Sequence, residues 1–272
     1  MKLVLPSALA LLAYIAATIG LWWRMRRVAG GQGINKLPIV GIALFAGVAH
    51  AVAIYQAIHA PHGINLGFFN ALSLEGWLIA LLVTLAATRQ PVENLGVALY
   101  PLAALALLSM VAFQSDEILP IAPGSPLQIH ILLSIGAYGV LTIAAVQAGA
   151  LAIQDRSLRN HHPGGLIRAL PPLRVMETLL FHLIGVGFAL LTMALLTGIL
   201  FLEDMFAQHL VHKTVLSLIA WSLFAVLLWG RIRHGWRGRK AIRWTLGGFI
   251  LLLLAYFGSK AVLELILKTP MT

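Results

Sequence analysis

Long apolar segments separated by short polar loops dominate the chain. Each segment reaches the length of about 20 residues that an α-helix needs to cross the hydrocarbon core of a bilayer. Eight segments can be traced: Leu3–Trp23, Pro38–His59, Gly67–Thr88, Val92–Phe113, Leu127–Gln154, Met176–Leu202, His212–Arg233 and Arg243–Leu267. The pattern predicts an all-α, polytopic integral membrane protein with about eight transmembrane helices, forming a single transmembrane domain over residues 1–272.

The first apolar segment, Leu3–Trp23, is expected to remain as a true span. A cleavable signal has a shorter apolar run with basic residues before it. Here the run is longer, and the basic cluster follows it.

Composition supports a membrane protein and excludes a soluble globular domain. Hydrophobic residues make up 60% of the chain and charged residues only 10%, whereas soluble domains carry about 25% charged residues. The net charge of +10 does not indicate nucleic acid as a partner, because the cations lie in short loops between apolar segments. Cysteine is absent, which excludes disulfides and cysteine-ligated metal sites.

The distribution of the cations predicts the orientation. Most of the 19 Lys and Arg residues lie in alternate loops, and loops rich in Lys and Arg stay in the cytoplasm. The remaining loops are acidic or neutral. Both termini are therefore expected outside the cytoplasm.

Two histidines lie inside apolar segments, where an ionisable group is costly and suggests a functional site. His50 has small residues on its helical face (Ala46, Ala49, Ala53 and Ala57), and His182 is followed by Gly185 and Ala189. Such faces leave room for a flat cofactor or let another helix approach closely. Counted from the cytoplasmic ends, His50 lies about 18 Å and His182 about 9 Å deep. The alternative is a neutral imidazole that hydrogen-bonds across helices.

Two more histidines begin apolar segments on the outer side. His130 opens the fifth segment and His212 the seventh, at the same expected membrane level. Imidazole is a common axial ligand of haem iron, so this pair suits binding of haem near the outer leaflet. Lys213 would then neutralise a haem propionate. The alternative is that these side chains extend into the lipid headgroups.

Several segments together resemble the cytochrome c assembly family, which includes the CcsA and CcmC haem-handling proteins. They are GVGFALLTMALLTGILF, KTVLSLIAW, GWRGRKA and LLLLAYFGSKAV, and within that family they are most similar to the inner-membrane YpjD/HemX-like branch. HILLSIGAYG around His130 matches the family's HxxxSxxAY-type haem-proximal histidine. His50, before FNALSLEGWLI, matches its first intramembrane histidine. The resemblance covers about residues 38–267 and implies location in the bacterial inner membrane, with haem iron ligated by His50 and His130.

The chain departs from the family at three places. The outer loop EDMFAQHLVHK replaces the tryptophan-rich WGxxWxWD-type loop of the haem presenters. Trp229 stands where the second intramembrane histidine is expected, and the second outer histidine would fall near Leu267. His182 and His212 are therefore proposed as replacement ligands from their positions alone.

These observations predict a haem-binding or haem-translocating membrane protein linked to cytochrome c biogenesis or haem homeostasis. Its cofactor-binding residues would be His50, His130, His182, His212 and Lys213. No catalytic nucleophile or glycine-rich phosphate loop is recognisable, so an enzyme is not expected.

Two other functions fit the sequence. One is a cofactor-free regulatory or scaffold subunit, whose basic loop Arg231–Arg243 would dock a membrane or cytoplasmic protein partner or bind anionic lipids. The other is a small-solute or divalent-metal transporter that uses His59, His62, His209 and His212 at the outer surface.

Overall fold

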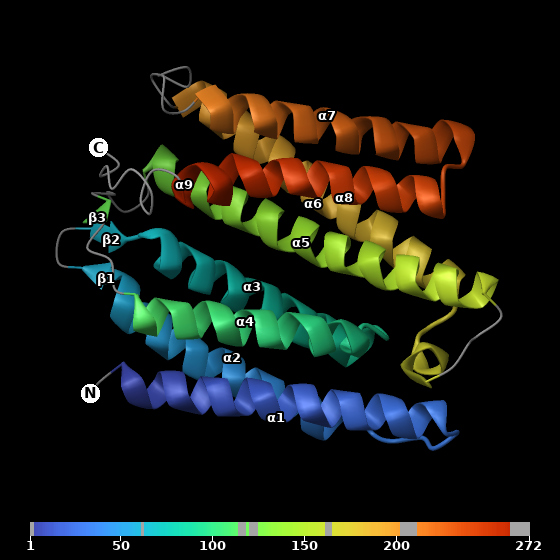
Figure 1. Ribbon diagram of the computed structural model, residues 1–272. Coiled ribbons are helices and arrows are strands. Elements are labelled where there is room, and N and C mark those ends of the chain that lie inside the picture. The colour runs from blue at the N-terminus through green and yellow to red at the C-terminus, as the bar shows by residue number, and fades with distance from the viewer. Residues whose placement is uncertain are drawn as a thin grey trace. The chain divides into compact units, whose positions relative to one another are not determined.

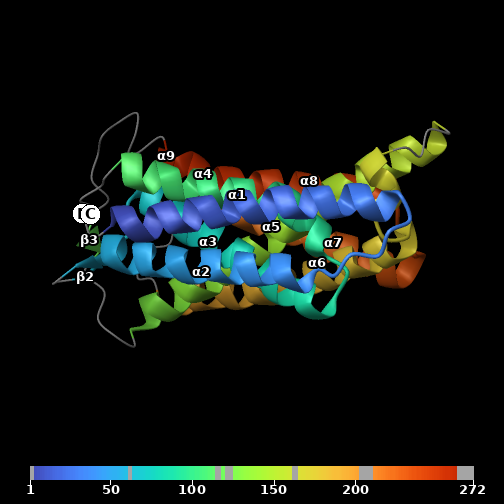
Figure 2. The same ribbon diagram turned by 90° about the horizontal axis from the view of Figure 1, so that it is seen from below.

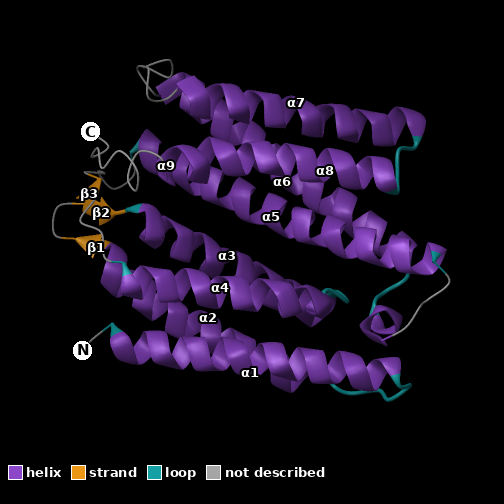
Figure 3. Ribbon diagram, in the orientation of Figure 1, coloured by secondary structure: helices purple, strands orange, loops and turns teal. Residues whose placement is uncertain are grey.

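A computed structural model describes residues 3–60, 63–113, 118–119, 125–160, 165–201 and 211–261. Within them, eight helical segments are long and apolar enough to cross a membrane, which confirms the all-α, polytopic prediction (Figures 1 and 3). The long helices are α1 (Val4–Ala29), α2 (Leu37–Ile58), α3 (Phe68–Arg89), α4 (Gly96–Ala112), α5 (Pro126–Arg159), α6 (Leu173–Phe201), α7 (Val211–His234) and α8 (Arg239–Leu253).

Short elements extend or connect these helices. The 3₁₀ helix η1 (Glu93–Leu95) leads into α4, and η2 (Gly165–Ala169) precedes α6. A π-helical turn η3 (Leu254–Gly258) and α9 (Ser259–Ala261) continue α8 to the end of the eighth span. The described residues also include short strands of two or three residues: β1 (His59–Ala60), β2 (Gly63–Asn65) and β3 (Ile118–Leu119).

Two helices continue well beyond the apolar segments that predicted them. Helix α1 runs to Ala29 and α5 to Arg159, each several residues into a basic stretch. Basic side chains suit the last turns of a helix because they face the negative end of its dipole. Arg26 also stacks on the ring of Trp22, with its guanidinium carbon 3.8 Å from the ring centroid. The hydropathy pattern therefore indicates where a helix leaves the hydrocarbon core of the bilayer, not where the helix ends.

The contacts between residues divide the chain into two compact units. The first comprises residues 1–61, 65–116 and 153–175. In it α1 packs on α2, α2 on α3, α3 on α4 and α4 back on α1, and Figures 1 and 2 show α1 running alongside α2. Its core is rich in small side chains, which let the helix backbones approach closely. The buried cluster includes Ala17, Ala43, Ala46, Ala80, Ala103 and Tyr100.

The second unit comprises residues 62–64, 117–152 and 176–272. Helix α7 packs on α8. Close approaches join the other helices: Gly187 with Leu141 (α6–α5), Trp221 with Thr192 (α7–α6) and Tyr138 with Phe257 (α5–η3).

Large apolar side chains remain exposed along the spans. Leu12, Leu105, Leu132 and Val186 are all more than half exposed. In a soluble protein such contiguous surface would signal an interaction site. In a protein with eight apolar spans, the bilayer is the solvent for this surface.

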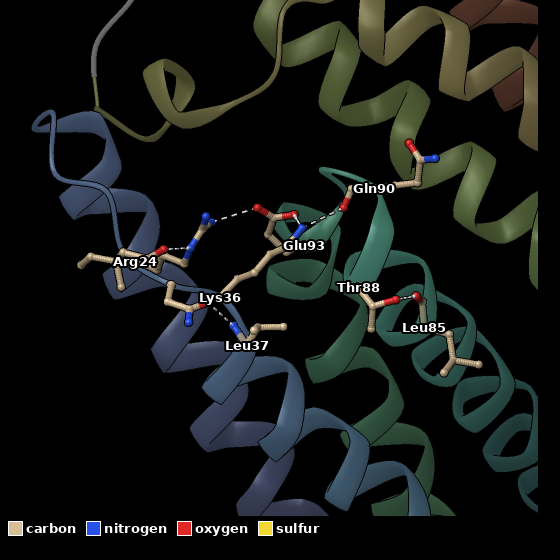
Figure 4. A network of polar contacts seen from close by, with 9 residues as sticks. Arg24, Lys36, Leu37, Leu85, Thr88, Gln90 and Glu93 are labelled. Carbon is tan, nitrogen blue, oxygen red and sulfur yellow. Dashed lines mark hydrogen bonds and ion pairs between the residues drawn. The ribbon is translucent and has the colours of Figure 1, made fainter.

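One ion-pair network fixes an end of the first unit (Figure 4). Glu93 accepts from Arg24 Nη1 at 3.0 Å and from Lys36 Nζ at 3.4 Å, so it joins η1 to the end of α1 and the start of α2. Arg24 Nε also donates to the carbonyl of Ile34 (2.9 Å), and Lys36 Nζ to that of Gln90 (3.1 Å). The Glu93 and Arg24 side chains are only 13% and 17% exposed, so water screens the pair poorly.

We expect Glu93→Gln to lower the free energy of unfolding by about 1–3 kcal/mol, because two cations lose their partly buried partner. The measurement is thermal or denaturant unfolding in detergent. Asp155→Asn is the matched control: it breaks the pair with Arg159, whose side chain is 49% exposed, and an exposed pair contributes about 0.5 kcal/mol. Equal effects of the two changes would contradict the importance of the Glu93 network.

Candidate functional site

His50 lies in the middle of α2 with no exposed surface. Its Nδ1 is 3.3 Å from the hydroxyl of Tyr14 on α1, and its Nε2 is 2.9 Å from Oγ of Ser73 on α3. Tyr14 and Ser73 are themselves fully buried. One imidazole therefore links three helices of the first unit, and both of its nitrogens are hydrogen-bonded.

The polar core around His50 continues through aromatic contacts. The Tyr14 ring meets the imidazole edge to face, with centroids 5.8 Å apart, and stacks on Tyr100 at 5.9 Å. The Thr84 hydroxyl donates to the carbonyl of Ala80 at 2.6 Å, so it accepts from the Tyr100 hydroxyl at 3.0 Å. The hydroxyls of Tyr14, Thr84 and Tyr100 thus find partners inside the unit, as burial requires.

The small residues beside His50 are covered by neighbouring helices. Ala46 and Ala53 have no exposed surface and Ala49 is 8% exposed. Trp77 of α3 also reaches α2, donating from Nε1 to the carbonyl of Gly47 at 2.8 Å. Of the two roles that small faces can have, close helix approach is the one observed here.

His130 lies in the second unit, in the first turns of α5, and is partly exposed. Its Nδ1 is 2.9 Å from the carbonyl oxygen of Ala194 and 3.3 Å from Thr197 Oγ1, both on α6. A carbonyl oxygen only accepts, so Nδ1 carries the proton and the neutral ring keeps a lone pair on Nε2. A histidine that ligates a metal typically donates its other N–H to a carbonyl or carboxylate in this way.

His182 is exposed on α6, and it lies far from His130. The carbonyl of Ala194, which holds His130, is twelve residues further along the same helix, about 18 Å at the helical rise. The two imidazoles therefore cannot share one iron.

His212 and Lys213 lie in the first turn of α7, with His212 exposed and Lys213 partly buried. The Trp221–Thr192 hydrogen bond of 2.9 Å fixes the register of α7 on α6. Along α7, His212 is nine residues from that bond, about 14 Å; along α6, Ala194 is two residues from it, about 3 Å. These counts place His212 nearer its helix end than the Ala194 carbonyl. They give no depth for His130 itself, so its expected level with His212 stays a prediction.

The other polar residues considered as metal ligands are placed only in part by the described residues. Among the described residues, no group of three or more His, Cys, Asp or Glu side chains comes together. His59 is exposed and stacks on Tyr55, while His62 and His209 lie outside the described residues. Glu75 is 6% exposed, and its Oε1 has no hydrogen-bond partner within the part of the chain that is described.

The sequence did not reveal the hydrogen-bond partners of His50 and His130. Tyr14 is a single polar ring in an apolar segment, and that isolation is the only signal for it. Ser73 belongs to a polar stretch of α3 with Asn70 and Glu75. Ala194 acts through its backbone carbonyl, so no residue pattern marks it.

Comparisons with known proteins agree with this architecture. Residues 38–267 match the Cytochrome C assembly protein family. The chain is 34% identical over 263 residues to the inner membrane protein YpjD of Escherichia coli, covering 94% of this chain and 98% of the relative. No solved structure matches.

More distant relatives are named cytochrome c biogenesis protein CcsA. The protein from Gloeothece citriformis is 26% identical over 113 residues, covering 41% of this chain and 34% of the relative. That from Chlamydomonas reinhardtii is 25% identical over 153 residues, covering 56% and 42%. With eight candidate spans and a full-length inner-membrane relative, the chain is a multi-pass inner-membrane protein that belongs to the cytochrome c assembly family.

Proposed function

We propose that this protein binds haem through His130 and handles it in cytochrome c biogenesis or haem homeostasis. One observation carries the proposal: Nδ1 of His130 donates to the carbonyl of Ala194, which leaves the Nε2 lone pair free for iron. Haem as the ligand is supported by membership of a family whose relatives include proteins named cytochrome c biogenesis protein CcsA.

The chain's own groups would prepare His130 as a ligand in two ways. The bond to Ala194 fixes the tautomer and the orientation of the ring, and it makes Nε2 a stronger donor to a metal. Thr197 Oγ1, at 3.3 Å from Nδ1, donates to the Ala194 and Met193 carbonyls and holds the same turn of α6. His130 would hold haem there through Nε2, and the haem would serve as cargo or as a redox centre.

Lys213 is proposed to pair with a haem propionate. It lies in the first turn of α7, in the same unit as His130, and is partly buried. A charged amine near a membrane surface can reach a carboxylate over several ångströms along its flexible stem. His212, one residue earlier in the same turn and exposed, would lie near the same propionate.

The test is an absorption spectrum of the purified protein. Protein from haem-replete cells, or apoprotein titrated with haem, is expected to show a Soret band that shifts on reduction. Pyridine haemochrome analysis gives the haem content per chain. Absence of the band under both conditions would overturn the proposal.

A cofactor-free scaffold is the second candidate, favoured by the basic segment Arg231–Arg243, which comprises the last turn of α7, a short connection and the first turn of α8. Arg231 Nη1 donates to the carbonyl of Trp236 (3.2 Å), and Lys240 stacks on the Trp236 ring. Other cations of the segment are exposed, among them Arg233, Arg237 and Arg243. This charged surface would suit an acidic cytoplasmic partner. Loss of a co-purifying protein in an Arg233→Gln/Arg237→Gln variant, with no haem in the wild type, would favour this function.

A further inference from the structure

We infer that His50 is not an iron ligand in this chain but the centre of a hydrogen-bond clamp that the N-terminal helix α1 closes. The clamp consists of Tyr14 on α1, His50 on α2 and Ser73 on α3. The inference narrows the ligand set of the proposed function, but the clamp itself does not depend on haem.

Both ring nitrogens of His50 are already hydrogen-bonded, so neither is left for a metal. An iron bonded to imidazole lies in the ring plane on the lone pair of one nitrogen. On the Nε2 side that place holds Ser73 Oγ at 2.9 Å, and on the Nδ1 side it holds the Tyr14 hydroxyl at 3.3 Å. None of the three side chains has more than a trace of exposed surface. At His130, by contrast, Nδ1 donates to the carbonyl of Ala194 and the lone pair of Nε2 is left for a metal.

The Tyr14 hydroxyl comes from a helix outside the family-matched residues. Helix α1 spans Val4–Ala29, entirely outside the family-matched residues 38–267. It nevertheless packs along both α2 and α4, and Tyr14 is the largest of its fully buried side chains. A helix outside the matched residues therefore covers the histidine that the resemblance identifies as intramembrane.

Burial makes both hydrogen bonds of His50 energetically important. A polar nitrogen without a hydrogen bond in an apolar interior carries a large desolvation penalty. Tyr14 and Ser73 both carry hydroxyls, and a hydroxyl donates as well as accepts. In one tautomer Tyr14 donates to Nδ1 and Nε2–H donates to Ser73; in the other both directions reverse. Either way each nitrogen of neutral His50 is satisfied, so the clamp holds α1, α2 and α3 together without a metal.

The experiment compares Tyr14→Phe, Ser73→Ala and His50→Ala with wild type by thermal unfolding in detergent and by Soret absorbance per chain. Tyr14→Phe is expected to lower the melting temperature by about 2–4 °C, because it deletes one buried hydrogen bond and little volume. Tyr55→Phe is the matched control: it makes the same change on α2 at a side chain that is 65% exposed, and no shift is expected.

A double-mutant cycle separates the clamp from unrelated packing. If the Tyr14 hydroxyl acts through His50, Tyr14→Phe lowers the melting temperature less in the His50→Ala background than in wild type. Full additivity, or Tyr14→Phe behaving like Tyr55→Phe, overturns the clamp. Because Tyr14→Phe is a mild change, the comparison with Tyr55→Phe remains decisive if His50→Ala does not fold.

Haem content tests independently whether His50 is a ligand of haem iron. Folded His50→Ala is expected to keep the wild-type Soret absorbance. Loss of the band in folded His50→Ala overturns the inference and leaves haem binding itself intact. A wild type without any haem would instead contradict the proposed function, and the melting-temperature cycle would still decide whether the clamp exists.

Discussion

His130→Ala is expected to remove haem from the purified protein, lowering Soret absorbance per chain by more than about tenfold. Loss of even an outer-shell partner of a metal-ligating histidine costs about 10–100-fold in affinity, and this change removes the ligand itself. His130 is partly exposed and sits near one end of α5, so the fold should tolerate alanine there. The measurement is the haemochrome content after purification from haem-replete cells.

His182→Ala is the matched control for that change. It deletes another imidazole of the same unit, from an exposed position about 18 Å along α6 from the Ala194 carbonyl, and haem content should not change. Added imidazole should restore part of the band in His130→Ala, because a free ligand can enter the space that the side chain leaves. A full Soret band in folded His130→Ala would exclude this histidine as the ligand.

The spans were predictable because membrane insertion depends on local composition. An apolar run of sufficient length has to form a helix in hydrocarbon, where each backbone N–H and C=O needs a partner within the segment. Residues 37–58 and 68–89 follow this rule closely. The end of α5 at Arg159 does not, because once a helix leaves the hydrocarbon its end depends on capping and charge.

The partners of the histidines depended on tertiary packing. Tyr14 lies 36 residues from His50, and Ala194 lies 64 residues from His130. The alanine face around His50 is compatible with a flat cofactor and with a neighbouring helix, and only the position of α1 decides between them. For His130 the partner is a backbone carbonyl, which every residue possesses and no pattern reveals.

The level of His212 relative to His130 stays a prediction. Both histidines begin apolar segments, so counting from the segment ends puts them at one level. In the folded unit, the hydrogen bond of Trp221 with Thr192 sets how far α7 slides along α6, and segment lengths do not encode that contact.

Gly187→Leu is expected to have the largest effect on stability, because α5 and α6 meet at this glycine. A Cβ at Gly187 would lie 2.6 Å from Cγ of Leu141, a side chain with no exposed surface. Forcing extra atoms into a packed interface costs about 1–3 kcal/mol or more. The two helices would have to separate two turns from Ala194, about 10 Å along α6, so the His130 bond should weaken as well.

Gly185→Leu provides the control, since nothing lies within 4 Å of the position of its Cβ. Replacing a helical glycine there should be neutral or stabilising by up to about 1 kcal/mol. The prediction is therefore that the change in unfolding free energy, measured in detergent, has opposite signs at two glycines only two residues apart on one helix. A parallel loss of Soret absorbance in Gly187→Leu alone would tie haem binding to the α5–α6 contact. Similar unfolding curves for the two variants would mean that this contact is not what holds His130 against α6.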